Sequence, residues 1–143
     1  RLNSSAASDV YKRQLQGGRD MIQAANEAKG DTKILGVSLL TSLDDSDTRE
    51  LYNNDFKKQF DNLINLAMET KIDGIVCSSQ ELELIKGTSL IKVVPGIRNQ
   101  HTFDDQKRVM TSGEAYSKGA DYIVVGRPIT QAKDIGEAIK DYS

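Results

Sequence analysis

The stretch DYIVVGRPIT, Asp121 to Thr130, decides the fold of this chain. Four apolar residues, Tyr122 to Val125, run directly into Gly-Arg-Pro with no polar loop between them. A second stretch, IKVVPGIRNQ (Ile91 to Gln100), also runs from apolar residues into a glycine that an arginine soon follows. Short, continuously apolar strands are typical of parallel sheets that helices cover on both faces. Because the guanidinium group suits phosphate, we expect the two strand-end arginines to share one anionic ligand.

The rest of the chain alternates between short apolar runs and helical patterns. Four strands are predicted, at 33–40, 73–78, 90–97 and 122–126. Helical spacing and end signals predict helices at 20–29, 56–71, 78–87, 111–119 and 134–142. Three of these helices begin with a capping signal, in which an acidic residue follows the cap by three positions: Ser78 and Glu81, Thr111 and Glu114, Asp134 and Glu137. Glycines at 30, 87 and 119 are predicted helix stops.

Alternating strands and helices indicate an α/β protein with a parallel sheet. The two candidate architectures are the (β/α)8 barrel and the doubly wound sheet. The G-x-G-x-x-G fingerprint of dinucleotide-binding sheets is absent from the sequence. Barrels often bind phosphate at the loops after their last two strands. There Gly126 would let a backbone N–H approach an anion, and Arg127 would bind it. The pattern therefore favours the barrel, although each arginine taken singly could equally be an ordinary ion-pair residue.

Composition sets limits on function. The chain has 143 residues, 38% hydrophobic and 28% charged, which fits a globular protein. A net charge of −2 argues against a nucleic-acid partner, and no apolar run is long enough for a membrane span. The single cysteine, Cys77, fits a reducing compartment and is predicted to be a buried small hydrophobe. We therefore expect a cytoplasmic protein, without a structural metal site.

The first fourteen residues, RLNSSAASDVYKRQ, differ from the rest. They show no periodicity and are rich in serine and alanine. They resemble translated adapter or vector sequence at the edge of an assembled gene fragment, so residues 1–14 are predicted to be non-native and outside the fold. The expected domain is then residues 15–143.

Four motifs carry a resemblance to a known family. At LLTS, VVPGIR, DDQKR and GADYIVVGRPIT the chain strongly resembles orotidine 5'-phosphate decarboxylase, over roughly residues 15–142. The resemblance implies a ribulose-phosphate-binding (β/α)8 TIM barrel, of which this chain would be the C-terminal half, from helix 4 through helix 8. It also implies a homodimer with active sites at the subunit interface, and a reaction that needs no metal or organic cofactor.

Site residues follow from the same resemblance. Thr41 and Ser42 would lie at the pyrimidine ring of the substrate, and Pro95 would line its pocket. Arg98 and Gln106 would belong to the loop that folds over the phosphate. Gly126 and Arg127 would bind the phosphate directly. The ligands implied are the nucleotides orotidine 5'-phosphate and UMP.

One departure from the family pattern concerns catalysis. The family uses a Lys-Asp-Lys-Asp array, mostly within D-x-K-x-x-D, and no such motif occurs in this sequence. Asp31 and Lys33 begin one, but Gly36 occupies its last position. The aspartate that the family donates across the dimer interface is also missing. We therefore expect a decarboxylase fragment, from an enzyme of de novo UMP synthesis, that is inactive by itself.

Other functions stay open from sequence alone. The chain could be another phosphate-binding TIM-barrel enzyme, or a non-catalytic module that binds a nucleotide phosphate. A half-barrel would also have two open edges, which invite pairing with other chains. We expect its strand residues to lose their closing partners. The fragment would then aggregate or self-associate, for example as a pseudo-barrel of two halves. The strand residues concerned are Val37, Ile75, Val76, Val93, Val94, Val124 and Val125.

Overall fold

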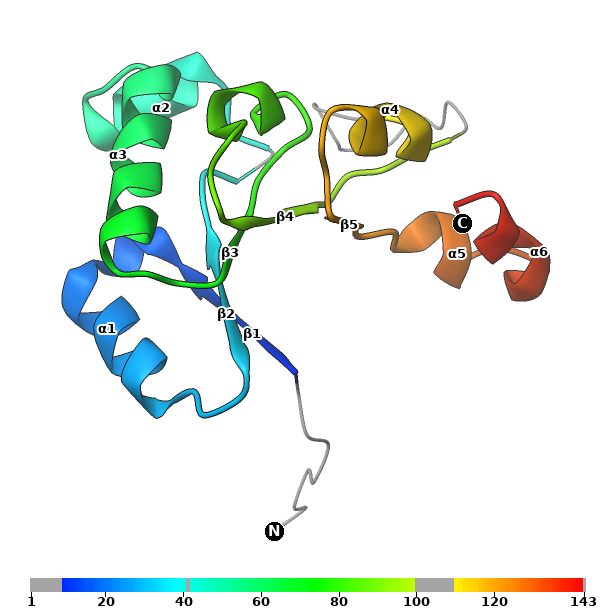
Figure 1. The fold of residues 1–143 in the computed structure, drawn as a ribbon. Helices are drawn as coiled ribbons and strands as arrows, with labels where there is room; N and C mark the ends of the chain where they lie inside the picture. The colour runs from blue at the N-terminus through cyan, green and yellow to red at the C-terminus, as the bar shows by residue number, and fades with distance from the viewer. Residues whose placement is uncertain (1–8, 41, 100–109, 143) are drawn as a thin grey trace, which may run out of the picture.

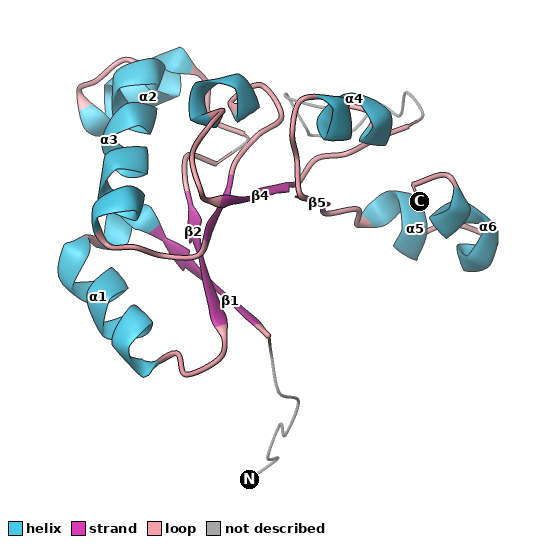
Figure 2. Cartoon of the chain, in the orientation of Figure 1, coloured by secondary structure: helices cyan, strands magenta, loops and turns pink. Residues whose placement is uncertain are grey.

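A computed structural model describes residues 9–40, 42–99 and 110–142. Its strands form one parallel sheet of five strands in the order β1-β2-β3-β4-β5, which is also their order along the chain. The strands are β1 (Val10–Gln14), β2 (Lys33–Val37), β3 (Gly74–Val76), β4 (Ile91–Val94) and β5 (Tyr122–Ile123). The predicted α/β class with a parallel sheet is therefore confirmed (Figure 2).

Helices follow most strands, as a barrel requires. The α-helices are α1 (Arg19–Ala28), α2 (Asp45–Tyr52), α3 (Phe56–Glu69), α4 (Ser112–Ser117), α5 (Arg127–Thr130) and α6 (Ile135–Lys140). Two 3-10 helices, η1 (Leu15–Gly17) and η2 (Leu82–Ile85), follow β1 and β3. Helices α1 to α3 lie beside the first strands, whereas α5 and α6 lie beyond β5 at the other end of the molecule (Figure 1). None of the helices within the described ranges has the length and apolar content needed to span a bilayer.

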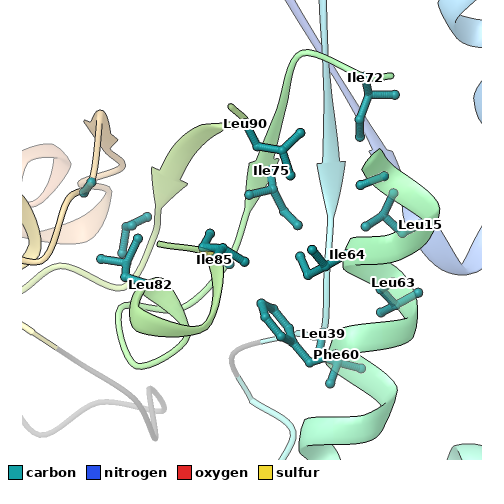
Figure 3. Packing of buried hydrophobic residues seen from close by; sticks show 14 of the residues in the cluster. Leu15, Leu39, Phe60, Leu63, Ile64, Ile72, Ile75, Leu82, Ile85 and Leu90 are labelled. Carbon is teal, nitrogen blue, oxygen red and sulfur yellow. The ribbon is translucent and has the colours of Figure 1, made fainter. Parts of the chain in front are cut away.

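The two faces of the sheet carry separate apolar clusters, because successive side chains of a strand point to opposite faces. On one face Leu35, Val76 and Val93 form a small cluster. On the other, the main core packs Ile34, Ile75 and Val94 against the helices. Figure 3 shows Phe60 and Ile64 of α3 lying near Leu39 and Ile75. The helical spacing of Phe60, Leu63, Ile64 and Ala67 thus has the predicted result, since all four are buried.

An aspartate precedes each of two strands and binds the neighbouring strand. The Asp73 carboxylate accepts a hydrogen bond from Ile34 N at 2.8 Å, while Asp73 N donates to Ile34 O at 3.1 Å. Asp121 makes the same pair of hydrogen bonds with Lys92. Its carboxylate accepts from Lys92 N at 2.7 Å, and Asp121 N donates to Lys92 O at 2.9 Å. Each aspartate therefore satisfies both backbone groups of one residue and sets the register of two adjacent strands.

Two sequence predictions need correction. The sheet has five strands rather than four, because Val10–Gln14 pairs in parallel with Lys33–Val37. These residues lie in the segment predicted to be outside the fold, and they lack the apolar run by which the other strands were predicted. Whether residues 1–14 are native stays a prediction.

The second correction concerns the helix predicted at 78–87, which is only the 3-10 helix η2. Half of its capping box forms, since Glu81 Oε2 accepts from Ser78 N at 2.8 Å. Glu81 N instead donates to the Ser78 carbonyl, and Ser78 Oγ is buried without a hydrogen-bond partner. A tight backbone turn has replaced the side-chain cap.

The N-caps predicted at Thr111 and Asp134 are confirmed, and the box at Thr111 is complete. Thr111 and Glu114 form both halves of their box at the start of α4, and Asp134 Oδ1 accepts from Glu137 N at the start of α6. The glycines predicted as stops, Gly30, Gly87 and Gly119, all have positive φ. Such backbone conformations favour glycine, so these helix ends could be predicted from the sequence.

Candidate functional site

The two strand-end arginines follow neighbouring strands. Val94 of β4 pairs with Ile123 of β5, and Val124 N donates to Val94 O at 2.8 Å. Because the strands are parallel, their carboxyl ends meet at one edge of the sheet. Arg98 and Arg127 therefore follow neighbouring strand ends at that edge, Arg98 in a loop and Arg127 at the start of α5.

The loop after β4 is held on both sides of Arg98. Gly96 has φ 76°, a conformation that favours glycine in the Pro95-Gly96 turn. Ile97 is fully buried, and Arg98 N donates to Met110 O at 2.9 Å. The half-buried Arg98 side chain also donates from a guanidinium nitrogen to Ile97 O at 2.8 Å. This loop therefore has a defined path up to Arg98.

Asn99 anchors the same loop to two helices, and the sequence reading missed it. Its side chain exchanges hydrogen bonds with Ser112, donating to Oγ at 3.0 Å and accepting from the backbone N–H at 2.8 Å. It also donates to Asp141 O, while Asn99 N donates to the Tyr142 hydroxyl at 3.3 Å. No local signal marks this residue, because its partners lie 13 to 43 positions away.

The loop after β5 leads at once into a short helix. Gly126 is the N-cap of α5, and its carbonyl accepts from Ile129 N and Thr130 N at 2.9 and 3.0 Å. A Cβ added at Gly126 would meet no other atom within 4 Å, so packing within the described chain does not demand glycine. Arg127, the first residue of α5, is exposed. The backbone at Gly126 thus stays open on a side that a ligand could occupy.

The other predicted site residues are less closely grouped. Pro95 is half-buried directly after β4, beside the residues just described. Ser42 is exposed in a turn after β2. Strand β3 lies between β2 and β4 in the sheet, so Ser42 follows a strand that is not adjacent to β4. Thr41 and Gln106 lie outside the described residues. The structure therefore brings Pro95, Arg98, Gly126 and Arg127 to neighbouring strand ends, while Ser42 shares only their edge of the sheet.

A hollow of about 520 Å³ lies near the ends of β2 and β3, apart from these arginines. Its lining residues are Leu43, Asp44, Asp45, Phe56, Gln80, Glu81 and Leu84. Asp44 is the N-cap of α2, and its side chain accepts a hydrogen bond from Asp47 N. Hydrogen bonds from Phe56 N and then from Arg49 hold the pKa of Asp45 below its usual value. Both aspartates already have structural hydrogen bonds, so the hollow is not a ready cation site.

Cys77 follows β3 and is 1% exposed, which confirms its predicted place in the core. Burial raises the pKa of its thiol, and the nearby Glu81 carboxylate adds to the effect. A protonated, covered thiol is a poor nucleophile. The candidate site is therefore one of binding groups, with no nucleophile identified among its described residues.

The fold defines the class of protein first. A parallel sheet with interleaved helices and polar loops at its carboxyl edge has the architecture of part of a (β/α)8 barrel. The chain belongs to the Orotidine 5'-phosphate decarboxylase / HUMPS family, whose model matches residues 3–142. This confirms the resemblance seen at the four sequence motifs.

The curated relatives are longer than this chain. The orotidine 5'-phosphate decarboxylase of Aquifex aeolicus (strain VF5) is 42% identical over 137 residues, which cover 92% of this chain and 59% of that protein. A Streptococcus pneumoniae (strain Hungary19A-6) protein of the same name is 40% identical, covering 99% of this chain and 65% of the relative. The chain thus spans about three-fifths of the length of the curated relatives it matches.

Solved structures of orotidine 5'-phosphate decarboxylases have a similar fold. The crystal structure of orotidine 5'-phosphate decarboxylase from Lactobacillus acidophilus has a TM-score of 0.76 and 28% sequence identity, and the match covers 93% of this chain and 62% of that one. The enzyme of that name from Pyrococcus horikoshii OT3 has a TM-score of 0.69 at 24% identity, which supports the fold alone.

Proposed function

We propose that this chain is the phosphate-binding part of an orotidine 5'-phosphate decarboxylase, which converts orotidine 5'-phosphate to UMP and CO2. The observation that carries the proposal is the position of Arg98 and Arg127 after the carboxyl ends of two hydrogen-bonded parallel strands. The identity of the substrate, orotidine 5'-phosphate, is inferred from the family to which the chain belongs.

The proposed roles follow from chemistry and position. Arg98 and Arg127 bind the 5'-phosphate with their guanidinium forks, and the N–H of Gly126 approaches the same group. Pro95 lines the pocket between the two loops. Thr41 and Ser42 contact the pyrimidine ring, and Gln106 closes over the phosphate. Asn99 does not contact the ligand in this proposal, but it holds the loop that carries Arg98.

Binding the phosphate contributes to a reaction that takes place elsewhere on the substrate. Loss of CO2 leaves carbanion character at the pyrimidine ring, which a preorganised array of charges stabilises. Contacts to the remote phosphate supply binding energy that lowers the barrier at the reacting carbon. Because this sequence contains no D-x-K-x-x-D array, we propose that it binds the nucleotide and does not turn it over alone.

For the whole protein, we propose a cytoplasmic homodimer with nucleotide ligands and no nucleic-acid partner. The mildly acidic net charge of −2 supports the last point, because nucleic-acid-binding surfaces are strongly basic. The dimer follows from the family resemblance and would bring each site to a subunit interface.

Calorimetry with UMP tests the binding role. We expect saturable binding to the chain, and about a tenfold or greater loss of affinity in Arg98→Ala and in Arg127→Ala. Arg127→Lys should lose part of the affinity, because lysine keeps the charge without the planar fork. Arg49→Ala is the matched control, since Arg49 pairs with Asp45 on α2. Unchanged affinity in both alanine variants would refute the shared phosphate site.

Turnover is measured separately, as CO2 release from orotidine 5'-phosphate. We expect no release above the uncatalysed rate from the chain alone. Clear turnover would contradict the assignment of catalysis to the missing array, even if the binding result held.

A further inference from the structure

Burial holds the inner strands of this chain but not its C-terminal end. Four of the seven strand residues expected to lose their closing partners are at most 9% exposed: Ile75, Val76, Val93 and Val94. For the inner strands that expectation is wrong, because helices and neighbouring strands already cover them. Beyond β5, by contrast, no residue of α5 or α6 is more than half-buried. Contacts other than deep burial therefore matter most at this end.

Asp141 and Tyr142, directly after α6, contact the loop that follows β4. The Tyr142 ring is half-buried and packs against the main apolar core, which limits where its hydroxyl can lie. That hydroxyl accepts a hydrogen bond from Asn99 N at 3.3 Å. The Asp141 carbonyl accepts one from the Asn99 side chain. The C-terminal end is thus joined to the residue next to Arg98.

The backbone of Arg98 is held on both sides as a result. Arg98 N donates to Met110 O at 2.9 Å, and the next N–H along the chain, that of Asn99, donates to the Tyr142 hydroxyl. These two N–H groups belong to the peptide units before and after the Arg98 Cα. Because each peptide unit is planar, holding both of them restricts the direction in which the Arg98 side chain leaves the loop.

The Asn99 side chain also connects this loop to α4. It donates to Ser112 Oγ at 3.0 Å and accepts from Ser112 N at 2.8 Å. Ser112 is the first residue of α4, and the complete capping box at Thr111 fixes the start of that helix. Loss of the Tyr142 hydrogen bond alone would therefore loosen the loop without releasing it.

We propose that Asp141 and Tyr142 are positioning residues for the phosphate site, which act through Asn99 to hold the backbone of Arg98. Neither residue contacts the ligand. An arginine that is already held in place loses less conformational freedom when it binds, so the affinity for the ligand is higher. This inference rests on the proposed function, because the position of Arg98 matters only if Arg98 binds the phosphate.

Tyr142→Phe is the smallest change that tests this role. The ring and its packing stay, and only the hydroxyl that accepts from Asn99 N is lost. Calorimetry with UMP should show binding that is weaker by about two- to tenfold, the range for one hydrogen bond. Tyr116→Phe is the matched control, since it removes the same atom from a tyrosine of α4 that is 47% exposed. Its affinity for UMP should equal that of the wild type.

Asn99→Ala removes the side-chain hydrogen bonds to Ser112 and Asp141 together. We expect a larger loss of UMP affinity than in Tyr142→Phe, of about tenfold or more. Circular dichroism of each variant checks that the fold is kept.

A double-mutant cycle separates positioning from a general loss of structure. If Tyr142 acts through Arg98, then Tyr142→Phe should not weaken UMP binding further once Arg98 is replaced by alanine. The same substitution should still weaken binding in the Arg127→Ala background. A merely structural role would weaken binding by the same factor in all three backgrounds.

Hydrogen exchange gives a readout that needs no ligand. Tyr142→Phe should speed exchange of the Asn99 amide, because this N–H loses its acceptor, while the amides of α3 stay unchanged. Coupling between two sites is reciprocal, so UMP bound to the wild type should slow exchange at Asp141 and Tyr142.

Three results would overturn the inference. The first is unchanged UMP affinity in both Tyr142→Phe and Asn99→Ala while Arg98→Ala weakens binding, which would leave the proposed function standing. The second is an effect of Tyr142→Phe that persists in full in the Arg98→Ala background, which would assign Tyr142 to general stability. The third is unchanged affinity in Arg98→Ala itself, in which case the proposed role of Arg98 fails and the inference fails with it.

Discussion

Asp73 connects three segments of the chain through one side chain. Its carboxylate accepts from Ile34 N at 2.8 Å and from Lys29 Nζ at 2.6 Å, while its own backbone pairs with Ile34. Burial raises the pKa of Asp73, but the hydrogen bonds from Lys29 and Ile34 outweigh burial and hold the pKa below its usual value. The ionised form is therefore the one that the folded chain stabilises.

Asp73→Asn tests this interpretation. The amide keeps an acceptor for Ile34 N but loses the charge, so we expect about 1–2 kcal/mol less stability near neutral pH. A carboxyl whose pKa falls on folding stabilises the fold above its unfolded pKa of about 4, and this contribution disappears as pH falls through the folded pKa. Urea unfolding should thus separate the variant from the wild type at neutral pH and bring them together in strong acid.

Asp61→Asn is the control for the charge change. Asp61 pairs with Lys57 on the exposed side of α3 at 2.7 Å, and such surface pairs contribute little. We expect no measurable change in this variant. A pH-independent loss of stability in Asp73→Asn would mean that the side chain acts by shape and not by charge.

At the scale of elements, β3 is confined by its two neighbours. A Cβ at Gly74 would lie 2.5 Å from Ile91 O and 2.8 Å from Leu35 Cδ2. The first of these is a backbone atom of β4, so it moves only if the sheet moves. Glycine at this position lets β3 lie tightly between β2 and β4.

Gly74→Ala should therefore destabilise the chain by about 2 kcal/mol, within the range of overpacked sites. Gly113→Ala makes the same chemical change within α4, where an added Cβ would meet nothing within 4 Å. That variant should be neutral or stabilised by about 0.5–1 kcal/mol, because alanine favours helices. Thermal or urea unfolding of the pair gives the comparison, and equal effects would contradict the packing argument.

At the scale of the whole molecule, the two ends differ in how much they bury. Helix α3 has four buried residues, Phe60, Leu63, Ile64 and Ala67, whereas no residue of α5 or α6 is more than half-buried. The end of α6 is connected to the loop after β4 through Asn99, which hydrogen-bonds to Asp141 and Tyr142. Local opening costs little where few apolar contacts are lost.

Hydrogen exchange should reveal this gradient. We expect the amides of α5 and α6 to exchange at least about tenfold faster than those of α3 in the chain alone. Asn99→Ala should speed exchange in α6 further, while leaving α3 unchanged. Uniform exchange along the chain would contradict the gradient.

Much of this fold could be predicted from short segments of the sequence. Apolar runs predicted four of the five strands, and the Thr111 and Asp134 caps and three glycine stops appeared where predicted. These signals are legible because they depend on residues within one turn or one strand. The motifs that contain Arg98 and Arg127 also placed both arginines after neighbouring strand ends, whereas their shared ligand stays a prediction.

Long-range contacts decided the rest. VYKRQ becomes a strand only because β2 lies beside it, and η2 is a tight turn where a capped helix was expected. The role of Asn99, the demand for glycine at Gly74 and the exposure of β5 all depend on partners distant in the chain. Strand order and burial are properties of segments packed together, so no local pattern contains them. Composition and motifs were sufficient for the class and family of this protein, whereas only its packing determined which edge of the sheet was left uncovered.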